Sequence, residues 1–102
     1  MTANAKRILF VCTGNIDRSL TAENILRGKL GFEALSAGTL TNASRRLSAS
    51  LIDWADIIFA MEEQHRNAVL AIRPEAENKT VVLGIPESYI RPPFFGAILL
   101  ID

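Results

Sequence analysis

Four short β-prone segments, separated by stretches with helical spacing, constrain the fold of this chain more than any other feature. They are Arg7–Val11, Phe32–Ala37, Asp56–Met61 and Thr80–Leu83. The first and third are continuous apolar runs, which is typical of strands buried on both faces. Strands that alternate with helices favour a parallel sheet covered by helices on both sides. We therefore predict a three-layer α/β/α fold with a four-stranded parallel sheet.

The segments between these strands carry helix signals. Residues 18–30 place apolar side chains at helical spacing, and Glu62–Ile72 begins with acidic residues and ends just before a proline. The polar, basic stretch Thr41–Ala49 leads into a shorter helix at residues 51–54. Each of the first three predicted strands is therefore followed along the chain by a predicted helix.

Length and hydropathy favour a single domain. The 102 residues, 49% of them hydrophobic, suffice for one core, so we predict one domain over residues 1–102. The longest apolar run, Phe94–Ile101, has eight residues, whereas a membrane-spanning helix needs roughly 20. Residues 1–7 are polar and precede no small-residue cleavage site, which argues against a secretory signal. We expect a soluble, cytoplasmic protein that does not bind membranes.

Charge and cysteine usage exclude several classes of function. Eleven Lys and Arg balance eleven Asp and Glu, which argues against a nucleic-acid binder. Residues 1–51 carry a net charge of plus four and residues 52–102 of minus four, so the first half suits an anionic ligand better. With one cysteine, Cys12, and one histidine, His65, the chain can form no internal disulfide and no Cys/His zinc cluster.

The segment from Cys12 to Ser19 carries the predicted chemistry. It places a thiol at the end of the first strand and Arg18 six residues later, where a helix begins. Such a loop can turn backbone N–H groups inward around an anion, and the helix N-terminus adds partial positive charge. The planar guanidinium of Arg18 can hold two phosphoryl oxygens, and the same positive field favours the nucleophilic thiolate of Cys12.

The whole loop is therefore the predicted phosphate site. Its members are Cys12, Thr13, Gly14, Asn15, Ile16, Asp17 and Arg18. Gly14 permits close backbone approach, and Asn15 tolerates a left-handed conformation. The carboxylate of Asp17 is expected to face outward, because it would repel a phosphate dianion inside the loop. Ser19 can offer its hydroxyl to the sulfur and favour the ionised form.

Several segments together resemble the low-molecular-weight protein tyrosine phosphatases. They are Ile8–Ser19, Thr21-Ala22-Glu23, Ser36–Thr39 and Ala55–Met61. The resemblance follows nearly the whole chain in order and is closest to the compact prokaryotic branch, although this chain is shorter than usual for the family. It implies hydrolysis of a phosphomonoester, such as protein phosphotyrosine, with inorganic phosphate as product and no metal or other cofactor.

The same resemblance assigns roles to individual residues. Cys12 would attack phosphorus, while Arg18 and the loop amides hold the oxygens. Water would then hydrolyse the cysteinyl phosphate, with Ser19 assisting the departing thiolate. Asn15 and Ser36 would brace the loop.

The C-terminal loop departs from the family pattern. There the family has an acidic residue, followed by proline and aromatic residues, that protonates the leaving phenol; here Pro92 stands at the acid's position. Glu87 in the same loop is the nearest substitute acid, with Asp102 and Asp17 less suitable. Losing general-acid assistance costs about 10² to 10⁴ in rate. The alternative function is therefore a degenerate, phosphatase-like module that binds phosphate or phosphotyrosine without turnover.

Two further functions fit less well. Arsenate reductases share the loop but relay oxidation through additional cysteines, and this chain has only Cys12. A phosphocysteine carrier of the sugar-transport type would use a similar loop, but such loops generally lack the arginine that stands here at position 18.

The remaining conspicuous side chains have simpler explanations. His65, on a predicted helix, is expected at the solvated surface, and Trp54 in the core or anchoring a helix. Arg45 and Arg46 either form a solvated face or flank the mouth of the site, where they would attract a phosphorylated substrate. Phe94 and Phe95 form either a wall for the substrate or the start of a terminal apolar helix. That helix could pack against a partner subunit, and the sequence leaves the oligomeric state open.

Overall fold

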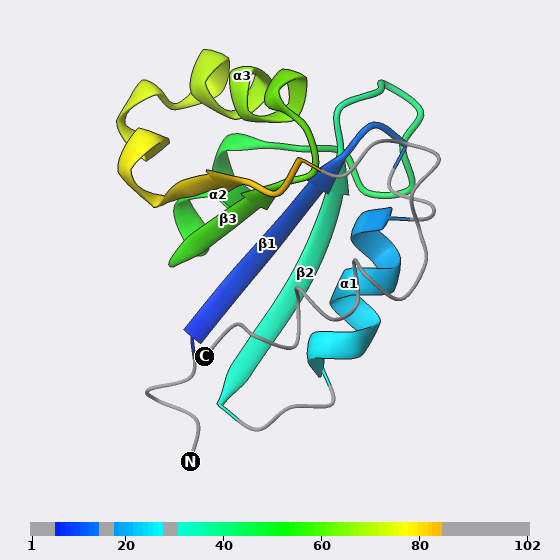
Figure 1. Ribbon diagram of the computed structural model, residues 1–102. Helices are drawn as coiled ribbons and strands as arrows, with labels where there is room; N and C mark the ends of the chain where they lie inside the picture. The colour runs from blue at the N-terminus through cyan, green and yellow to red at the C-terminus, as the bar shows by residue number, and fades with distance from the viewer. Residues whose placement is uncertain (1–5, 15–17, 28–30, 85–102) are drawn as a thin grey trace.

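The computed structural model describes residues 6–14, 18–27 and 31–84 (Figure 1). In this part of the chain the elements are β1 (Lys6–Cys12), α1 (Arg18–Arg27), β2 (Phe32–Gly38), α2 (Ala49–Trp54), β3 (Ile57–Ala60), α3 (Glu63–Ile72), the 3-10 helix η1 (Pro74–Lys79) and β4 (Thr80–Val82). All four predicted strands and all three predicted helices are present.

The strands form one parallel sheet in the order β2-β1-β3-β4. In its register, Ile8 of β1 pairs with Ala34 of β2 and Ile57 of β3. Because β1 has a strand on each side and helices on both faces, its residues 8–12 are buried, as the continuous apolar run predicted. The predicted α/β fold with a four-stranded parallel sheet is confirmed.

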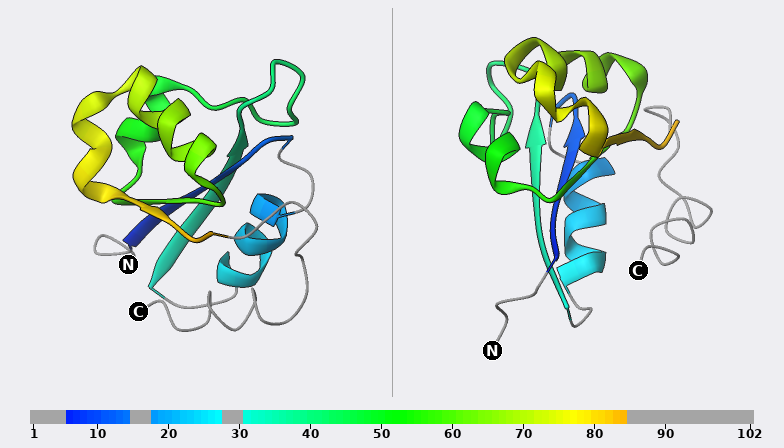
Figure 2. Two further views of the ribbon diagram at one scale, coloured as in Figure 1. Left: turned by 45° about the horizontal axis from the view of Figure 1, so that its top comes forward. Right: turned by 90° about the vertical axis from the view of Figure 1, so that its left-hand side faces the viewer.

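Helices cover both faces of the sheet (Figure 2). The cluster on the α1 face contains Ile8, Phe10, Cys12, Ala22, Leu26, Ala34, Phe59 and Met61. The opposite cluster, under α2, α3 and η1, contains Leu9, Val11, Ala37, Leu47, Ile52, Ala55, Ile58, Val69 and Ala76. Alternate residues of β1 therefore enter opposite cores, which fixes the orientation of Cys12 toward α1.

The element ends follow local chemistry. Ser48 caps α2 by accepting the backbone N–H of Leu51 at 3.3 Å. Glu62 is the N-cap of α3, one residue before the helix proper. The 3-10 helix η1, which the apolar pattern did not predict, begins at Pro74, where a fixed φ suits the first helical position. Residues 28–30 of the first predicted helix and the apolar run Phe94–Ile101 lie outside the described residues.

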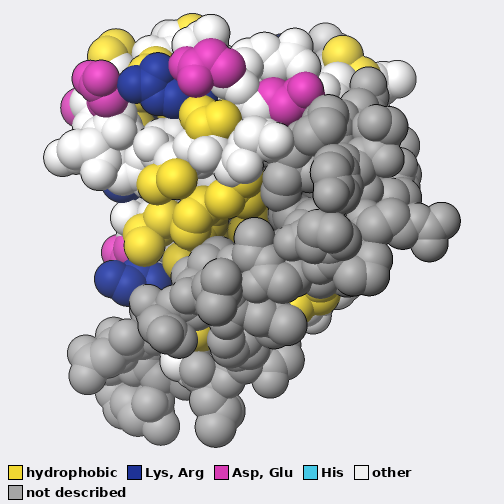
Figure 3. Space-filling model, viewed as in Figure 1, with side chains coloured by type: hydrophobic (Ala, Val, Ile, Leu, Met, Phe, Trp, Pro, Cys, Tyr) yellow, Lys and Arg dark blue, Asp and Glu magenta, His cyan; other side chains and the backbone are white. Residues whose placement is uncertain are grey.

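One face of the molecule carries a group of charged side chains beside an apolar area. Charged side chains gather over α3 and η1, and hydrophobic ones lie over the neighbouring part of the sheet (Figure 3). Arg66 of α3 bonds both Glu63 and Glu77 there, at 3.1 and 3.3 Å. None of the helices within the described ranges has the length and hydropathy needed to cross a membrane.

Candidate active site

Cys12 is the last residue of β1 and lies at the carboxyl edge of the sheet. Its side chain is 3% exposed, and its backbone lies in register with Gly38 at the end of β2. Met61, which follows β3, shares the apolar cluster of Cys12 and donates its N–H to the carbonyl of Val11 at 3.0 Å. The ends of β1, β2 and β3 therefore meet at the carboxyl edge of the sheet, where ligands bind in open parallel sheets.

The helix α1 begins at Arg18, so the N-terminus of a ten-residue helix follows Cys12 after a short loop. Its unpaired N–H groups and the helix dipole place partial positive charge at the loop that Cys12 opens. Cys12 is thus the last residue of a strand, and Arg18 is the first residue of a helix. The side chains of Arg18 and Ser19 are not among those described, so their roles stay predictions.

Two consecutive carbonyls, those of Cys12 and Thr13, point toward the segment that follows β2. They accept the N–H groups of Thr39 and Leu40, each at 3.0 Å. In a trans peptide unit the carbonyl and the following N–H point in opposite directions. The N–H groups of Thr13 and Gly14 therefore point away from residues 39 and 40. Successive amides turned to one side are what a backbone anion site requires.

His65 connects this loop to α3. Its side chain is 1% exposed; Nδ1 accepts the N–H of Glu62 at 3.0 Å, and Nε2 lies 2.9 Å from Oγ1 of Thr13. The prediction of a solvated histidine is wrong, because the first turn of α3 packs at the sheet edge where the loop begins. The available signal was the spacing of Glu62 and His65, which form a capping box with histidine at the third helical position.

A buried polar cluster lies between α1 and β2. Ser36, fully buried, donates its hydroxyl to Oε1 of Glu23 at 2.6 Å. Arg45 reaches the same oxygen at 3.5 Å and the carbonyl of Ser36 at 3.3 Å. Glu23 was not among the predicted site residues, because its partners Ser36 and Arg45 lie elsewhere in the sequence. The proposed bracing of the loop by Ser36 stays a prediction, since residues 15–17 lie outside the described part.

The two neighbouring arginines behave differently. Both are exposed, but the side chain of Arg45 bonds Glu23 and the carbonyl of Ser36, whereas the backbone of Arg46 forms a β-bridge with Gly38. Trp54 is partly buried beside the α2-side core, with the guanidinium of Arg7 5.9 Å from its ring centroid. Trp54 is therefore a packing residue, one of the two roles that its sequence context predicted.

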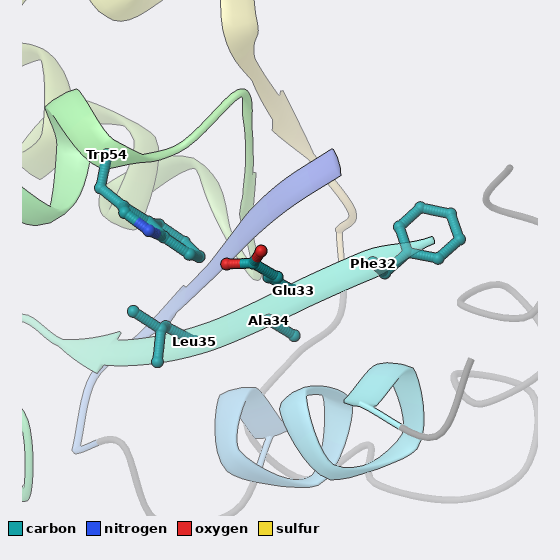
Figure 4. A pocket seen from close by; sticks show the side chains of 5 residues that line it. All are labelled: Phe32, Glu33, Ala34, Leu35 and Trp54. Carbon is teal, nitrogen blue, oxygen red and sulfur yellow. The ribbon is translucent and has the colours of Figure 1, made fainter. Parts of the chain in front are cut away.

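A surface hollow lies elsewhere on the molecule. It is lined by Phe32, Glu33, Ala34, Leu35 and Trp54 (Figure 4). Phe32 begins β2, whereas Cys12 is in register with Gly38 at the other end of that strand. The hollow is therefore separate from the phosphate loop.

Among the described residues, the groups with shifted pKa values also lie away from Cys12. A backbone hydrogen bond from Arg7 lowers the pKa of Asp56, which precedes β3 at the opposite edge of the sheet. Hydrogen bonds from Arg73 lower the pKa of Asp53, and the same contact raises that of Arg73.

Among residues 6–14, 18–27 and 31–84, no group of three acidic, histidine or cysteine side chains is placed to hold a metal ion.

Several predicted site residues lie outside the described part of the chain. Asn15, Ile16 and Asp17 of the loop lie outside the described residues, as do the candidate acid Glu87 and the aromatic pair at positions 94 and 95. The structure thus brings together Cys12, Thr13, Gly14 and the start of α1, with Ser36 behind them.

Comparison with known proteins decides the family. Residues 7–46 match the family model described as low molecular weight phosphotyrosine protein phosphatase. The low molecular weight protein-tyrosine-phosphatase Etp of Escherichia coli strain K12 is 34% identical over 113 residues, covering 80% of this chain and 76% of Etp. The chain belongs to the low molecular weight phosphotyrosine phosphatase family. The predicted membership is therefore confirmed.

Two further relatives show the range within this phosphatase family. The protein-arginine-phosphatase of Geobacillus stearothermophilus is 34% identical over 120 residues, covering 90% of this chain and 81% of the relative. The structure of Vibrio vulnificus Wzb in complex with benzylphosphonate superposes with a TM-score of 0.72 at 30% identity, covering 96% of this chain and 92% of that one. Family members thus include tyrosine and arginine phosphatases, and one binds a phosphonate.

Proposed function

We propose that this protein hydrolyses phosphomonoesters, with protein phosphotyrosine as the substrate class, through a cysteinyl-phosphate intermediate. The observation that carries the proposal is the position of Cys12, at the end of a buried parallel strand with the N-terminus of α1 following at Arg18. The carbonyls of Cys12 and Thr13 support it, because both bond the segment after β2 and so leave the N–H groups of Thr13 and Gly14 pointing away from that segment. Membership of a cysteine-dependent phosphatase family supports it further.

The reaction proceeds in two displacements. In the first, the Cys12 thiolate forms a bond to phosphorus as the ester P–O bond breaks, and the leaving oxygen takes a proton from the candidate acid Glu87. In the second, water attacks phosphorus, the S–P bond breaks, and the water proton passes to Glu87. Arg18 and the loop amides hold the charged oxygens throughout. The Cys12 thiolate is regenerated and phosphate departs.

Phosphoarginine is a second candidate substrate. The observation in its favour is the similarity to the protein-arginine-phosphatase, which covers 90% of this chain. The same thiolate would attack phosphorus, and the broken bond would be P–N rather than P–O. Comparing phosphotyrosine with phosphoarginine peptides of the same sequence distinguishes the two substrates by their kcat/KM values.

The proposal is tested by pre-steady-state hydrolysis of para-nitrophenyl phosphate near pH 6. We expect a burst of phenol release followed by steady turnover in the wild type, and neither in Cys12→Ser. Glu87→Gln should slow the burst by about 10²-fold or more if Glu87 is the acid. Glu75→Gln, an exposed carboxylate on η1, is the matched control. Absence of release from the wild type would contradict the proposal.

The same experiment tests the non-catalytic alternative. A phosphate-binding module without an effective acid would show no release, yet inorganic phosphate would still protect Cys12 from alkylation by iodoacetate. Pro92, at the family's acid position, motivates this alternative. A protein that neither releases phenol nor gains protection would have no working phosphate site at all.

A further inference from the structure

A chain of hydrogen bonds runs from the N-terminus of α3 to the residue after Cys12. The backbone nitrogen of Glu62 lies 3.0 Å from Nδ1 of His65, and Nε2 of the same ring lies 2.9 Å from Oγ1 of Thr13. A backbone N–H can only donate, so Nδ1 accepts and carries no hydrogen. The neutral ring therefore carries its hydrogen on Nε2 and donates it to Thr13.

Burial makes this arrangement specific. His65 is 1% exposed, so a lost hydrogen bond at either ring nitrogen is not readily replaced by water. Turning the ring over would place carbon atoms where the two nitrogens now bond. A hydrogen on Nδ1 would point at the backbone N–H of Glu62, so two donors would face each other with no acceptor between them. One tautomer and one orientation of the ring are thus selected.

Thr13 is held from two sides as a result. Its carbonyl accepts the N–H of Leu40 at 3.0 Å, and its hydroxyl accepts from His65 at 2.9 Å. The first contact comes from the segment after β2 and the second from α3. Together they restrict the backbone at the start of the loop, where the N–H groups of Thr13 and Gly14 would meet a phosphate.

We propose that His65 is a positioning residue for the phosphate-binding loop, acting through the hydroxyl of Thr13. This inference rests on the proposed function of the loop and adds a residue to it. His65 touches no reacting atom in this role. By restricting the loop before phosphate binds, His65 reduces the loss of conformational entropy on binding. Its removal therefore weakens phosphate binding.

Paired substitutions isolate the bond at each end. Thr13→Val removes the hydroxyl while keeping the shape, and Thr13→Ser restores it. In His65→Gln the amide nitrogen can take the place of Nε2 and still donate to Thr13. In His65→Asn the amide oxygen can take the place of Nδ1 and still accept from Glu62, but the side chain is too short to reach Thr13. Asn67→Ala, exposed on α3, is the control.

The measurement is the affinity for inorganic phosphate, by calorimetry and by protection of Cys12 from iodoacetate. We expect Thr13→Val and His65→Asn each to weaken binding about five- to tenfold, the range of one net hydrogen bond. The double variant should be no weaker than either single one. Thr13→Ser and His65→Gln should stay within about twofold of the wild type. With para-nitrophenyl phosphate, KM should rise by the same factor.

The outcomes separate the two proposals. Additive losses in the double variant, or a fall in melting temperature without weaker phosphate binding, would overturn the positioning role alone. A wild-type protein that binds no phosphate would overturn the proposed function and this inference with it. Circular dichroism of each variant confirms that the comparison is between folded proteins.

Discussion

The hydroxyl of Ser36 donates a 2.6 Å hydrogen bond to Oε1 of Glu23, and both side chains are buried. The bond joins β2 to α1 behind the start of the phosphate loop, with Ser36 in register with Phe10 of β1. A buried carboxylate is tolerated only when hydrogen-bond donors compensate its negative charge. Arg45 supplies a second donor to Glu23 at 3.5 Å. The Ser36–Glu23 bond thus holds α1, whose N-terminus faces the loop, against the sheet.

Replacement of Ser36 by alanine should therefore destabilise the fold. It removes a donor from a buried carboxylate, so the free energy of unfolding should fall by about 1–3 kcal/mol. Urea denaturation of Ser36→Ala measures this loss. Ser44→Ala, at an exposed position, is the control and should change stability by less than about 0.5 kcal/mol. Equal stability of the two variants would show that the Ser36 bond contributes nothing.

Disruption of the stacked pair of Phe10 and Phe59 should strongly destabilise the core. Phe10 is fully buried, and its ring centroid lies 5.7 Å from that of Phe59. Phe10→Ala should lower the free energy of unfolding by about 3–5 kcal/mol, since it leaves a cavity between β1, β3 and α1. Leu40→Ala, at a side chain 48% exposed, should stay within about 0.5 kcal/mol. A loss below about 1 kcal/mol for Phe10→Ala would mean that this core can collapse around the gap.

Lys79, the last residue of η1, forms hydrogen bonds with the end of α2. Its Nζ donates to the carbonyls of Ile52 and Ala55 at 2.8 and 2.6 Å. Lys79→Met keeps the apolar stem but leaves both carbonyls without this donor, so stability should fall by about 1–3 kcal/mol. Lys6→Met, at an exposed lysine of β1, is the control in the same urea titration. If both variants lose the same stability, the hydrogen bonds from Lys79 to the carbonyls of α2 do not explain the loss.

Acid should weaken the contact between Asp56 and β1. The N–H of Arg7 donates to Oδ2 of Asp56 at 2.9 Å and lowers the pKa of that carboxyl. A lowered folded-state pKa stabilises the fold above the unfolded-state pKa, and this contribution is lost as pH falls through the folded-state value. The stability difference between wild type and Asp56→Asn should therefore be constant near neutral pH and shrink in acid. A difference that stays constant down to about pH 2.5 would contradict this linkage.

Most of the fold follows from local patterns. The run at Arg7–Val11 predicted the central strand, because a strand with neighbours on both sides and helices on both faces has no polar positions. The end of α3 was predicted from Pro74, which cannot continue a helix. The 3-10 helix η1 was not predicted, since six residues with one buried side chain, Ala76, carry too little periodicity.

By itself, the sequence determined where the thiol and the helix N-terminus would be. Strand, turn residues and helix follow one another within residues 7–30, so the loop from Cys12 to Arg18 could be placed from neighbouring residues alone. The family resemblance used this segment together with Ser36–Thr39 and Ala55–Met61. Local hydrogen bonding and hydropathy are encoded over a few positions, which is why such features can be predicted without a structure.

Only the tertiary structure decided which side chains form hydrogen bonds beside the start of the loop. His65 reaches Thr13 across 52 positions of sequence, and Ser36 reaches Glu23 across 13. Neither pairing leaves a periodic signal, because a hydrogen bond between elements depends on how helices pack against the sheet. The same histidine pattern would suit an exposed helix face equally well. Packing of α3 at the carboxyl edge of the sheet buried His65 and set its two nitrogens in opposite roles.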